Sequence, residues 1–579
     1  MAVRPDIYDP LEEYATVFRD KFKQVAQDTF DKLAQEANVD VDANRQTCQL
    51  LYRAQNDQQS LRDGIAGLQF LFGLLIVVTI AGVVWLCVQA EELDPHLAVG
   101  ILATSVVSVF VALLAVLPPI RNKKEELKQI SSRVTELRQQ AWEQMAALNQ
   151  LYDWDMLTRM MSQTVPRLEF DDYFTTQRLA DLEKTYGWDG SFNEDRSVLY
   201  AHSGLINGNP FIICRTKKME MGTKTYSGSK VIHWTTYERG SDGKYHTRYH
   251  SQTLTATVTA PCPYYYEKTR VIYGNVAAPD LIFSRVDNNL AGRESSLAYK
   301  WERRKLRKKA RDLTTSDYAM MTNEEFEVLF NTSNRNNNQQ YALLFTPLAQ
   351  ESMLKLMRDE EHGYGDDFDF HKHRMINTIV PQHMQEMTLD CNPKQYEHYD
   401  FEHAKANFVA TNAEHFRAIY FSLAPLLCVP MYQQIRSHED IYGRRMKKRS
   451  AFWEHEALAN FWGKRYFQHP SCVTDCILKT SNKVGKDDKS VIQVTAYGYR
   501  TEQHVEYVSR LGGDGYWHNV PVHWDEYIPV TGEGKLEIHE DNEAPPTTIT
   551  QRERMHRIND ILSRSQYRYY RRHIASAYH

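Results

Sequence analysis

LQFLFGLLIVVTIAGVVWLCV (residues 68–88) and LAVGILATSVVSVFVALLAVL (97–117) decide the fold of this 579-residue chain. Both stretches are apolar and contain no charged residue. Each has the ~20 residues that an α-helix needs to cross the ~30 Å hydrocarbon core of a bilayer. Two buried core helices are the alternative, which a tandem of two uncharged stretches of this length disfavours. The sequence therefore predicts a transmembrane hairpin over residues 67–118.

The charges around these stretches predict the topology. The connector QAEELDPH (89–96) contains acidic residues and no Lys or Arg, whereas basic residues flank the hairpin on both sides. Lys and Arg are enriched on the cytoplasmic side of membrane proteins. We therefore expect both termini in the cytoplasm and the acidic connector outside. The basic residues used in this comparison are Arg53, Arg62, Arg121, Lys123, Lys124 and Lys128.

Small residues recur four apart in the second stretch, and such a face allows helices to approach closely in lipid. They are Gly100, Thr104, Ser108 and Ala112. This face is predicted to pack on the first span, with homo-oligomerisation as the alternative.

Apolar residues at three- and four-residue spacing flank the hairpin and predict amphipathic helices over 1–66 and 119–165. Their seam is heptad-like, as in a coiled coil. A hairpin brings the two segments together, so we expect an antiparallel helical stalk; packing of these helices against the soluble domain is the alternative. Pro118 and Pro119 should kink or restart the second helix. The residues of the two seams are Leu11, Tyr14, Phe18, Phe22 and Val25, then Leu127, Ile130, Val134, Leu137, Ala141, Met145 and Leu148.

The remaining mass is predicted to be a cytosolic α+β body over 170–535. Two β-rich blocks, 199–284 and 472–530, alternate in polarity and contain turn signals such as Asp242-Gly243. They predict antiparallel meanders, in one sheet or two. Helical segments are expected between them, near 297–312, 347–360, 402–417 and 450–466, which suggests partly segregated sheet and helices. A basic helix is expected over 547–579.

Composition restricts the function classes. The net charge of -5 disfavours a dedicated nucleic-acid binder. The eight cysteines are scattered along the chain, which fits reduced thiols in a cytosolic compartment. Cys472 and Cys476 form CVTDC, but no second Cys/His pair at finger spacing accompanies them, so the pattern gives little support for zinc.

HGYGDDFDFHKH (362–373) is the candidate metal cluster, since imidazole and carboxylate groups suit zinc, manganese or iron. Asp366, Asp369, His371 and His373 are its candidate ligands, and the two histidines would share a face of a strand. No standard metal motif is matched, and a polar loop is the alternative. No phosphate-binding loop, nucleophile elbow or dinucleotide fingerprint occurs, so no cofactor is predicted and the sequence does not indicate an enzyme.

KWERRKLRKKAR (300–311) is a basic patch on an expected helix. Three hypotheses compete for it: a solvated helix face, docking on anionic lipid headgroups, and an acidic partner such as nucleic acid. Its basic residues include Lys300, Arg303, Arg304, Arg307, Lys308 and Arg311.

EEFEVLF (324–330), a short polar interval and QQYALLFTPLAQESMLKLM (339–357) follow one another in an order that resembles a family of uncharacterised bacterial membrane proteins. In that family an acidic, Phe-rich segment leads through a polar turn to an apolar strand and a Thr-Pro helix start. GLINGNPFIICRTKKME (204–220) is similar to the family's preceding strand-turn-strand element. The matching positions are Phe326, Phe330, Tyr341, Leu344, Thr346, Pro347, Met353 and Leu356.

The resemblance covers about residues 10–360. It implies a bacterial inner-membrane location and two closely spaced spans with a cytosolic domain of unknown function, and no catalytic residue. NTSNRNNNQQ (331–340) would be a loop inside one domain, YALLF (341–345) a strand, and Thr346 the cap of a helix that begins at Pro347.

These patterns together favour a membrane-anchored cytosolic binding or scaffold module. Its expected partners are the lipid bilayer and either another protein or a second copy of the chain. The alternatives are a membrane-tethered metal-dependent hydrolase that uses 366–373, and a subunit of an envelope or secretion complex.

Overall fold

The computed structural model describes residues 7–88, 95–239, 241, 244–288, 290–312, 318–435, 449–483, 490–540, 550–564 and 566–578. The chain divides into two compact units. The helical unit contains 27–152 and 393–410, and the sheet unit contains 1–26, 153–392 and 411–579.

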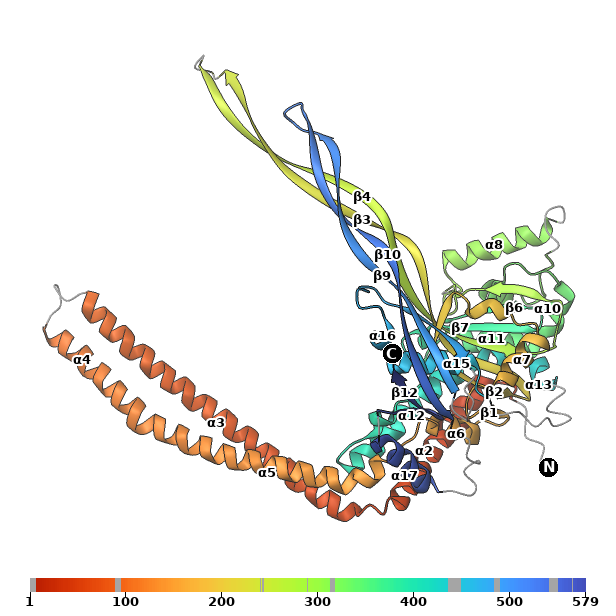
Figure 1. Cartoon of the computed structure of the whole chain (residues 1–579), viewed down its shortest axis with the longest axis horizontal. Helices are drawn as coiled ribbons and strands as arrows, with labels where there is room; N and C mark the ends of the chain where they lie inside the picture. Colours follow the sequence, from red (N-terminus) through yellow and green to blue (C-terminus); the bar gives the residue numbers. More distant parts are fainter. Residues whose placement is uncertain are drawn as a thin grey trace. The chain divides into compact units, whose positions relative to one another are not determined.

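Two long helical segments dominate the helical unit (Figure 1). One is α3 (Val41–Val88), and the other runs through α4 (Pro95–Phe110), a π-helical turn η2 (Val111–Val116) and α5 (Leu117–Asn149). Both are long and apolar enough to cross a membrane. The connector residues 89–94 lie outside the described part of the chain.

The segments pack antiparallel, with Leu51 of α3 against Val134 and Leu137 of α5. Gln58 donates to Ser131 over 2.8 Å farther along the same seam. The second segment changes from π-helix to α-helix at Leu117, directly before Pro118 and Pro119. Proline lacks the backbone N–H that an α-helix needs, which explains why the helix restarts here.

The stripe of small residues faces α3 only in part. Ser108 and Ala112 are buried, and the Oγ1 of Thr79 lies 2.7 Å from the Oγ of Ser108. Gly100 and Thr104 are exposed instead.

The first amphipathic segment does not belong to the stalk over its whole length. It forms α1 (Pro10–Glu13), η1 (Tyr14–Phe18) and α2 (Arg19–Glu36), and residues 10–26 belong to the sheet unit. There Phe22 stacks on Phe416 of α12 (Phe401–Leu427), with ring centroids 4.2 Å apart. This corrects the expected stalk over 1–66, because the apolar face of residues 14–22 is aromatic and packs on the aromatic face of α12.

The sheet unit contains two separate antiparallel sheets. The first has the order β1-β2-β3-β4-β7-β6-β5 and the second the order β11-β12-β10-β9-β8. The strands of the first are β1 (Leu168–Phe170), β2 (Arg196–Ile206), β3 (Asn209–Arg239), β4 (Tyr245–Gly274), β5 (Ile282–Arg285), β6 (Phe368–His373) and β7 (Ile376–Pro381). The strands of the second are β8 (Ile477–Lys483), β9 (Ser490–Leu511), β10 (Trp517–Glu540), β11 (Arg568–Tyr570) and β12 (His573–Tyr578).

The chain's last described residues differ from expectation. The expected helix over 547–579 ends at Arg564 as α17 (Gln551–Arg564), and β11 and β12 follow it. Arg571, between these strands, is buried and pairs with Glu454 at 3.0 Å. The carboxylate of Glu454, far away in the sequence, therefore neutralises Arg571, which the basic character of the local sequence predicts to be exposed.

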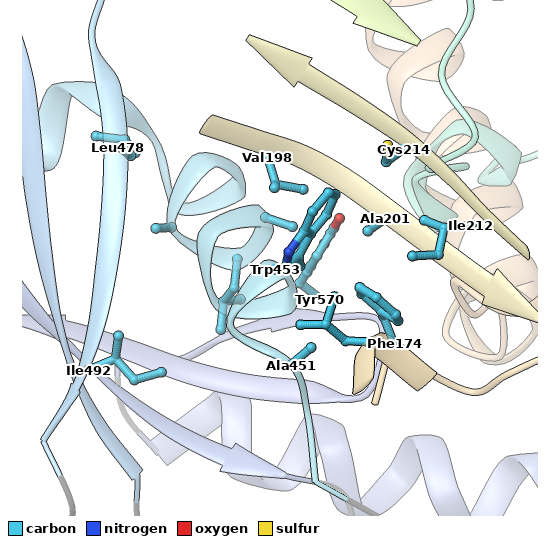
Figure 2. Packing of buried hydrophobic residues seen from close by; sticks show 14 of the residues in the cluster. Phe174, Val198, Ala201, Ile212, Cys214, Ala451, Trp453, Leu478, Ile492 and Tyr570 are labelled. Atoms are coloured by element: carbon cyan, nitrogen blue, oxygen red, sulfur yellow. The ribbon is translucent and has the colours of Figure 1, made fainter. Parts of the chain in front are cut away.

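Helix α15 (Phe452–Trp462) lies between the two sheets at the centre of the core, and Figure 2 shows Trp453 among side chains from both. Trp453 is 2% exposed and its ring lies 5.8 Å from that of Phe174. Burying one such aromatic contributes about 3 kcal/mol. The other helices are α6 (Met156–Thr164), α7 (Thr176–Lys184), η3 (Gly190–Asn193), α8 (Leu297–Arg311), α9 (Glu324–Phe330), α10 (Asn338–Leu344), α11 (Pro347–Arg358), η4 (His383–Gln385), η5 (Pro393–Tyr396), α13 (Pro430–Gln434) and α16 (Lys464–Phe467).

Residues 331–337 of the polar run form a loop inside the sheet unit, and residues 338–340 are the first residues of α10. Ser333 pairs with Ser284 of β5, and the Ile282 amide donates to Asn336 over 2.7 Å. Thr346 caps α11 and Pro347 is its first residue, as expected. The expected strand 341–345 is wrong, because Asn337 accepts from the Gln340 amide and starts α10 there.

Candidate binding surface

Two long hairpins leave the body of the sheets and run beside each other (Figure 1). In β3 and β4 the pairing is continuous from Phe211↔Tyr273 to Arg239↔Tyr245, but β2 accompanies β3 only as far as Lys218. The unaccompanied part is about 70 Å long at ~3.3 Å per residue. The β9–β10 hairpin likewise continues without a third strand beyond the residues that pair with β8 and β12. The predicted turn at Asp242-Gly243 lies outside the described residues.

The two hairpins pack on each other through their inner faces. Ile232 and Leu254 of β3 and β4 form a cluster with Val520 and Val522 of β10. At Gly228 the backbones are so close that a Cβ would collide with the carbonyl oxygen of Pro521. Side chains alternate along a strand, so this contact fixes which residues of each hairpin face outward.

The outer face of the β3–β4 hairpin is mostly a ladder of hydroxyl groups. Its cross-strand pairs are Thr225↔Thr259, Ser227↔Thr257, Ser229↔Thr255 and Val231↔Thr253. Thr is a polar residue that favours strands, so this face suits contact with water. Exposed tyrosines follow only toward the hairpin's end, at Tyr237, Tyr245 and Tyr249.

The outer face of the β9–β10 hairpin exposes large apolar side chains among polar ones. Trp517 pairs with Leu511, and they are 71% and 55% exposed. Tyr507 pairs with Pro521 on the same face and is 66% exposed, and Val505 follows it two residues away. The polar pair Ser509↔Asn519 lies between these two apolar pairs. Groups of large exposed apolar side chains mark interaction sites on soluble protein surfaces.

The described outward positions of this face include no Lys or Arg. Its other outward positions are Gln503, Ser509, Asn519, His523 and Asp525. Phosphate groups of lipid or nucleic acid are recognised chiefly by Lys and Arg. The face therefore fits an apolar protein surface better than an anionic lipid or a nucleic acid. We call residues 505, 507, 511 and 517 the apolar arm face.

The basic patch lies on α8, whose buried side is formed by Tyr299, Glu302 and Leu306. Arg303 is half-buried and Arg307 pairs with Glu324. The remaining predicted residues, Lys300, Arg304, Lys308 and Arg311, are exposed. The same helix has two large exposed apolar side chains: Leu297, just before the patch, and Trp301, within it, are 84% and 65% exposed.

The candidate metal ligands do not converge. Asp366 pairs with the buried Arg285 and also accepts from the Asn288 amide. Asp369, His371 and His373 alternate along β6, so they share a face as predicted, and burial lowers the pKa of His371. Within the described residues, only Glu502, His504 and Glu526 bring three potential ligand atoms within 4.8 Å of one another, and the four predicted ligands form no such group.

Sequence reasoning missed both the Glu502–His504–Glu526 group and the apolar arm face. Each depends on cross-strand register, such as Glu502↔Glu526 and Leu511↔Trp517. The alternation in HVEYVSRL was the available signal for the face, but alternation alone does not say which side is covered.

No protein-family model, curated protein or solved structure matches this chain.

Proposed function

We propose that the protein is a membrane-anchored binding module. In this proposal 68–88 and 97–117 cross a bacterial inner membrane, and both termini and the sheet unit are cytoplasmic. The length and apolar character of the two helices support the spans. Outward-facing side chains such as Phe70 and Val88, both 76% exposed, would be covered by lipid. The surplus of Lys and Arg outside the connector supports the orientation.

The single observation that supports a binding role is the apolar arm face. Leu511 and Trp517 contact each other across the hairpin, yet each still exposes more than half of its side chain to water. Covering such side chains with a partner contributes about 25 cal/mol per Å² of apolar surface. The proposed occupant is another protein with an apolar, uncharged surface.

A metal-dependent hydrolase at 366–373 has less support. Its first candidate ligand, Asp366, already neutralises Arg285, and an additional cation would compete with that buried guanidinium. A subunit of an envelope or secretion complex is a special case of the binding module, in which the partner of the arm face is a permanent neighbour.

The binding role is tested by paired double variants of the full chain. Leu511→Ser/Trp517→Ser should lower the yield of co-purified partner at least tenfold in quantitative mass spectrometry. The matched control, Thr255→Ala/Thr257→Ala, changes the outer face of the other hairpin and should leave the yield unchanged. Equal partner yields from the two double variants would contradict the proposal.

A second contact, between α8 and anionic lipid, is favoured by the exposed Leu297 and Trp301 among basic residues, a combination typical of helices that lie in the membrane interface. The full chain in nanodiscs should be cleaved by trypsin within 300–311 more slowly when the lipid is anionic. Cleavage at the exposed Lys244 serves as the control. Equal rates in neutral and anionic nanodiscs would exclude this contact.

A further inference from the structure

Cys472 and Cys476 lie side by side at the base of the β9–β10 hairpin. Their Sγ atoms are 3.6 Å apart. Cys472 is partly exposed and Cys476 is 1% exposed. A disulfide needs an Sγ–Sγ distance of about 2.05 Å, so the two sulfur atoms need to approach each other by about 1.5 Å to form the bond.

The loop that contains both cysteines is held against β9. The Val473 amide donates to the Tyr499 carbonyl over 2.9 Å, and the Tyr499 amide donates to the Thr474 hydroxyl over 3.0 Å. Gly498 lies under the thiols, where a Cβ would be 2.5 Å from the Sγ of Cys472 and 3.0 Å from that of Cys476. A glycine at this position thus leaves room for two sulfur atoms over one strand.

The neighbouring charged groups are engaged elsewhere. Asp475 accepts from Lys217 over 2.9 Å and from Lys464 over 2.6 Å. Within the part of the chain that the structure describes, no third His, Cys, Asp or Glu ligand converges with the two thiols. A structural zinc site needs four protein ligands, so the geometry favours a redox pair over zinc.

We propose that Cys472 and Cys476 form a reversible dithiol/disulfide couple, oxidised by a low-molecular-weight disulfide such as glutathione disulfide. The Cys472 thiolate attacks the disulfide, forms a mixed disulfide and releases one thiolate. The Cys476 sulfur, after losing its proton to solvent base, then attacks the Sγ of Cys472 and expels the second thiolate. The pair loses two electrons and two protons, and the oxidant becomes two thiols. Such couples in the cytosol are usually transient and redox-sensing.

The different exposure of Cys472 and Cys476 assigns the attacking and the resolving role to them. Cys472 is the thiol that an external disulfide can reach, so it is the attacking sulfur. Burial, together with the hydrogen bond to Cys472, raises the pKa of the Cys476 thiol to about 12. Cys476 is therefore the resolving sulfur, and its step is the slower of the two.

The test uses the full chain in nanodiscs, equilibrated with glutathione buffers of increasing oxidised fraction, acid-quenched and alkylated. Trypsin releases both cysteines in one peptide, 466–479, which should lose two alkyl groups together as the buffer becomes oxidising. The buried Cys214 is the internal control and should keep its label.

Two variants keep the proposal falsifiable. Cys476→Ser should accumulate the glutathione mixed disulfide at position 472, because the resolving sulfur is missing. Cys472→Ser should leave Cys476 reduced across the same buffers. Three results would overturn the proposal: labels lost one at a time, a peptide that stays fully alkylated, and protection of both thiols by stoichiometric zinc that a chelator reverses.

Discussion

The two hairpins of the arm share one architecture and differ in what they show to the outside. Both are long antiparallel ribbons, and both bury an inner face at the contact around Ile232 and Val522. Between Thr225 and Val231 the outer face of β3–β4 is mostly a hydroxyl ladder, and exposed tyrosines follow toward the hairpin's end, whereas the outer face of β9–β10 presents Leu511 and Trp517. The inner faces supply the buried apolar contact between the two hairpins. We propose that the hydroxyl ladder contacts water and that the apolar arm face contacts a partner.

Disrupting the contact between the inner faces of the two hairpins should have the largest effect on the stability of the arm. Gly228→Ala places a Cβ against the Pro521 carbonyl, so the hairpins must move apart. We expect a loss of about 3 kcal/mol in local opening free energy, measured by hydrogen exchange of amides 226–232 and 252–258. The adjacent outward residue provides the control, since Ser229→Ala should change exchange by less than about 0.5 kcal/mol. Similar losses for both variants would show that the assigned faces are wrong.

Two valines on the β9–β10 hairpin provide a second comparison between the inner and the outer face. Val522 is fully buried between the hairpins and Val505 is 43% exposed on the apolar arm face. Val522→Ala should destabilise the arm by about 2 kcal/mol, because it removes two methyl groups from a packed cluster. Val505→Ala should cost under about 0.5 kcal/mol by the same exchange measurement. A larger loss at 505 than at 522 would reverse the proposed orientation of the hairpin.

The root of the β9–β10 hairpin should respond to acid. His573 on β12 is buried, and burial lowers its pKa to about 3, so the folded protein holds it neutral. The unfolded chain takes up a proton below about pH 6.5. Stability is thus highest above pH 6.5 and should fall by about 1 kcal/mol between pH 7 and 5.5.

His573→Phe tests whether His573 causes the loss of stability at low pH. The variant keeps a ring against Tyr173 and cannot be protonated. The opening free energy of β10 and β12, measured by hydrogen exchange, should depend less steeply on pH in this variant. An unchanged pH profile would exclude His573 as the cause.

Sequence patterns predicted the two apolar helices, the antiparallel hairpins and the cap at Thr346, because each depends on residues near one another in the chain. They failed where contacts between residues far apart in the sequence determine the structure. The tail forms strands because Arg571 meets Glu454, and residues 10–26 leave the stalk because Phe22 meets Phe416. The apolar arm face was not predictable for the same reason. Strand alternation separates Leu511 from Arg510, but only the packing of Gly228 on Pro521 shows which of them faces outward.

Site-specific photo-crosslinking in native membranes tests the central claim most directly. A photoreactive phenylalanine analogue replaces Tyr507 on the apolar arm face or Thr255 on the hydroxyl ladder, one at a time in the full chain. We predict a discrete crosslinked protein species from position 507 that is absent from position 255 and is lost when Leu511→Ser/Trp517→Ser is added. No crosslink at 507, or the same species at both positions, would contradict the claim that the apolar arm face is the binding surface.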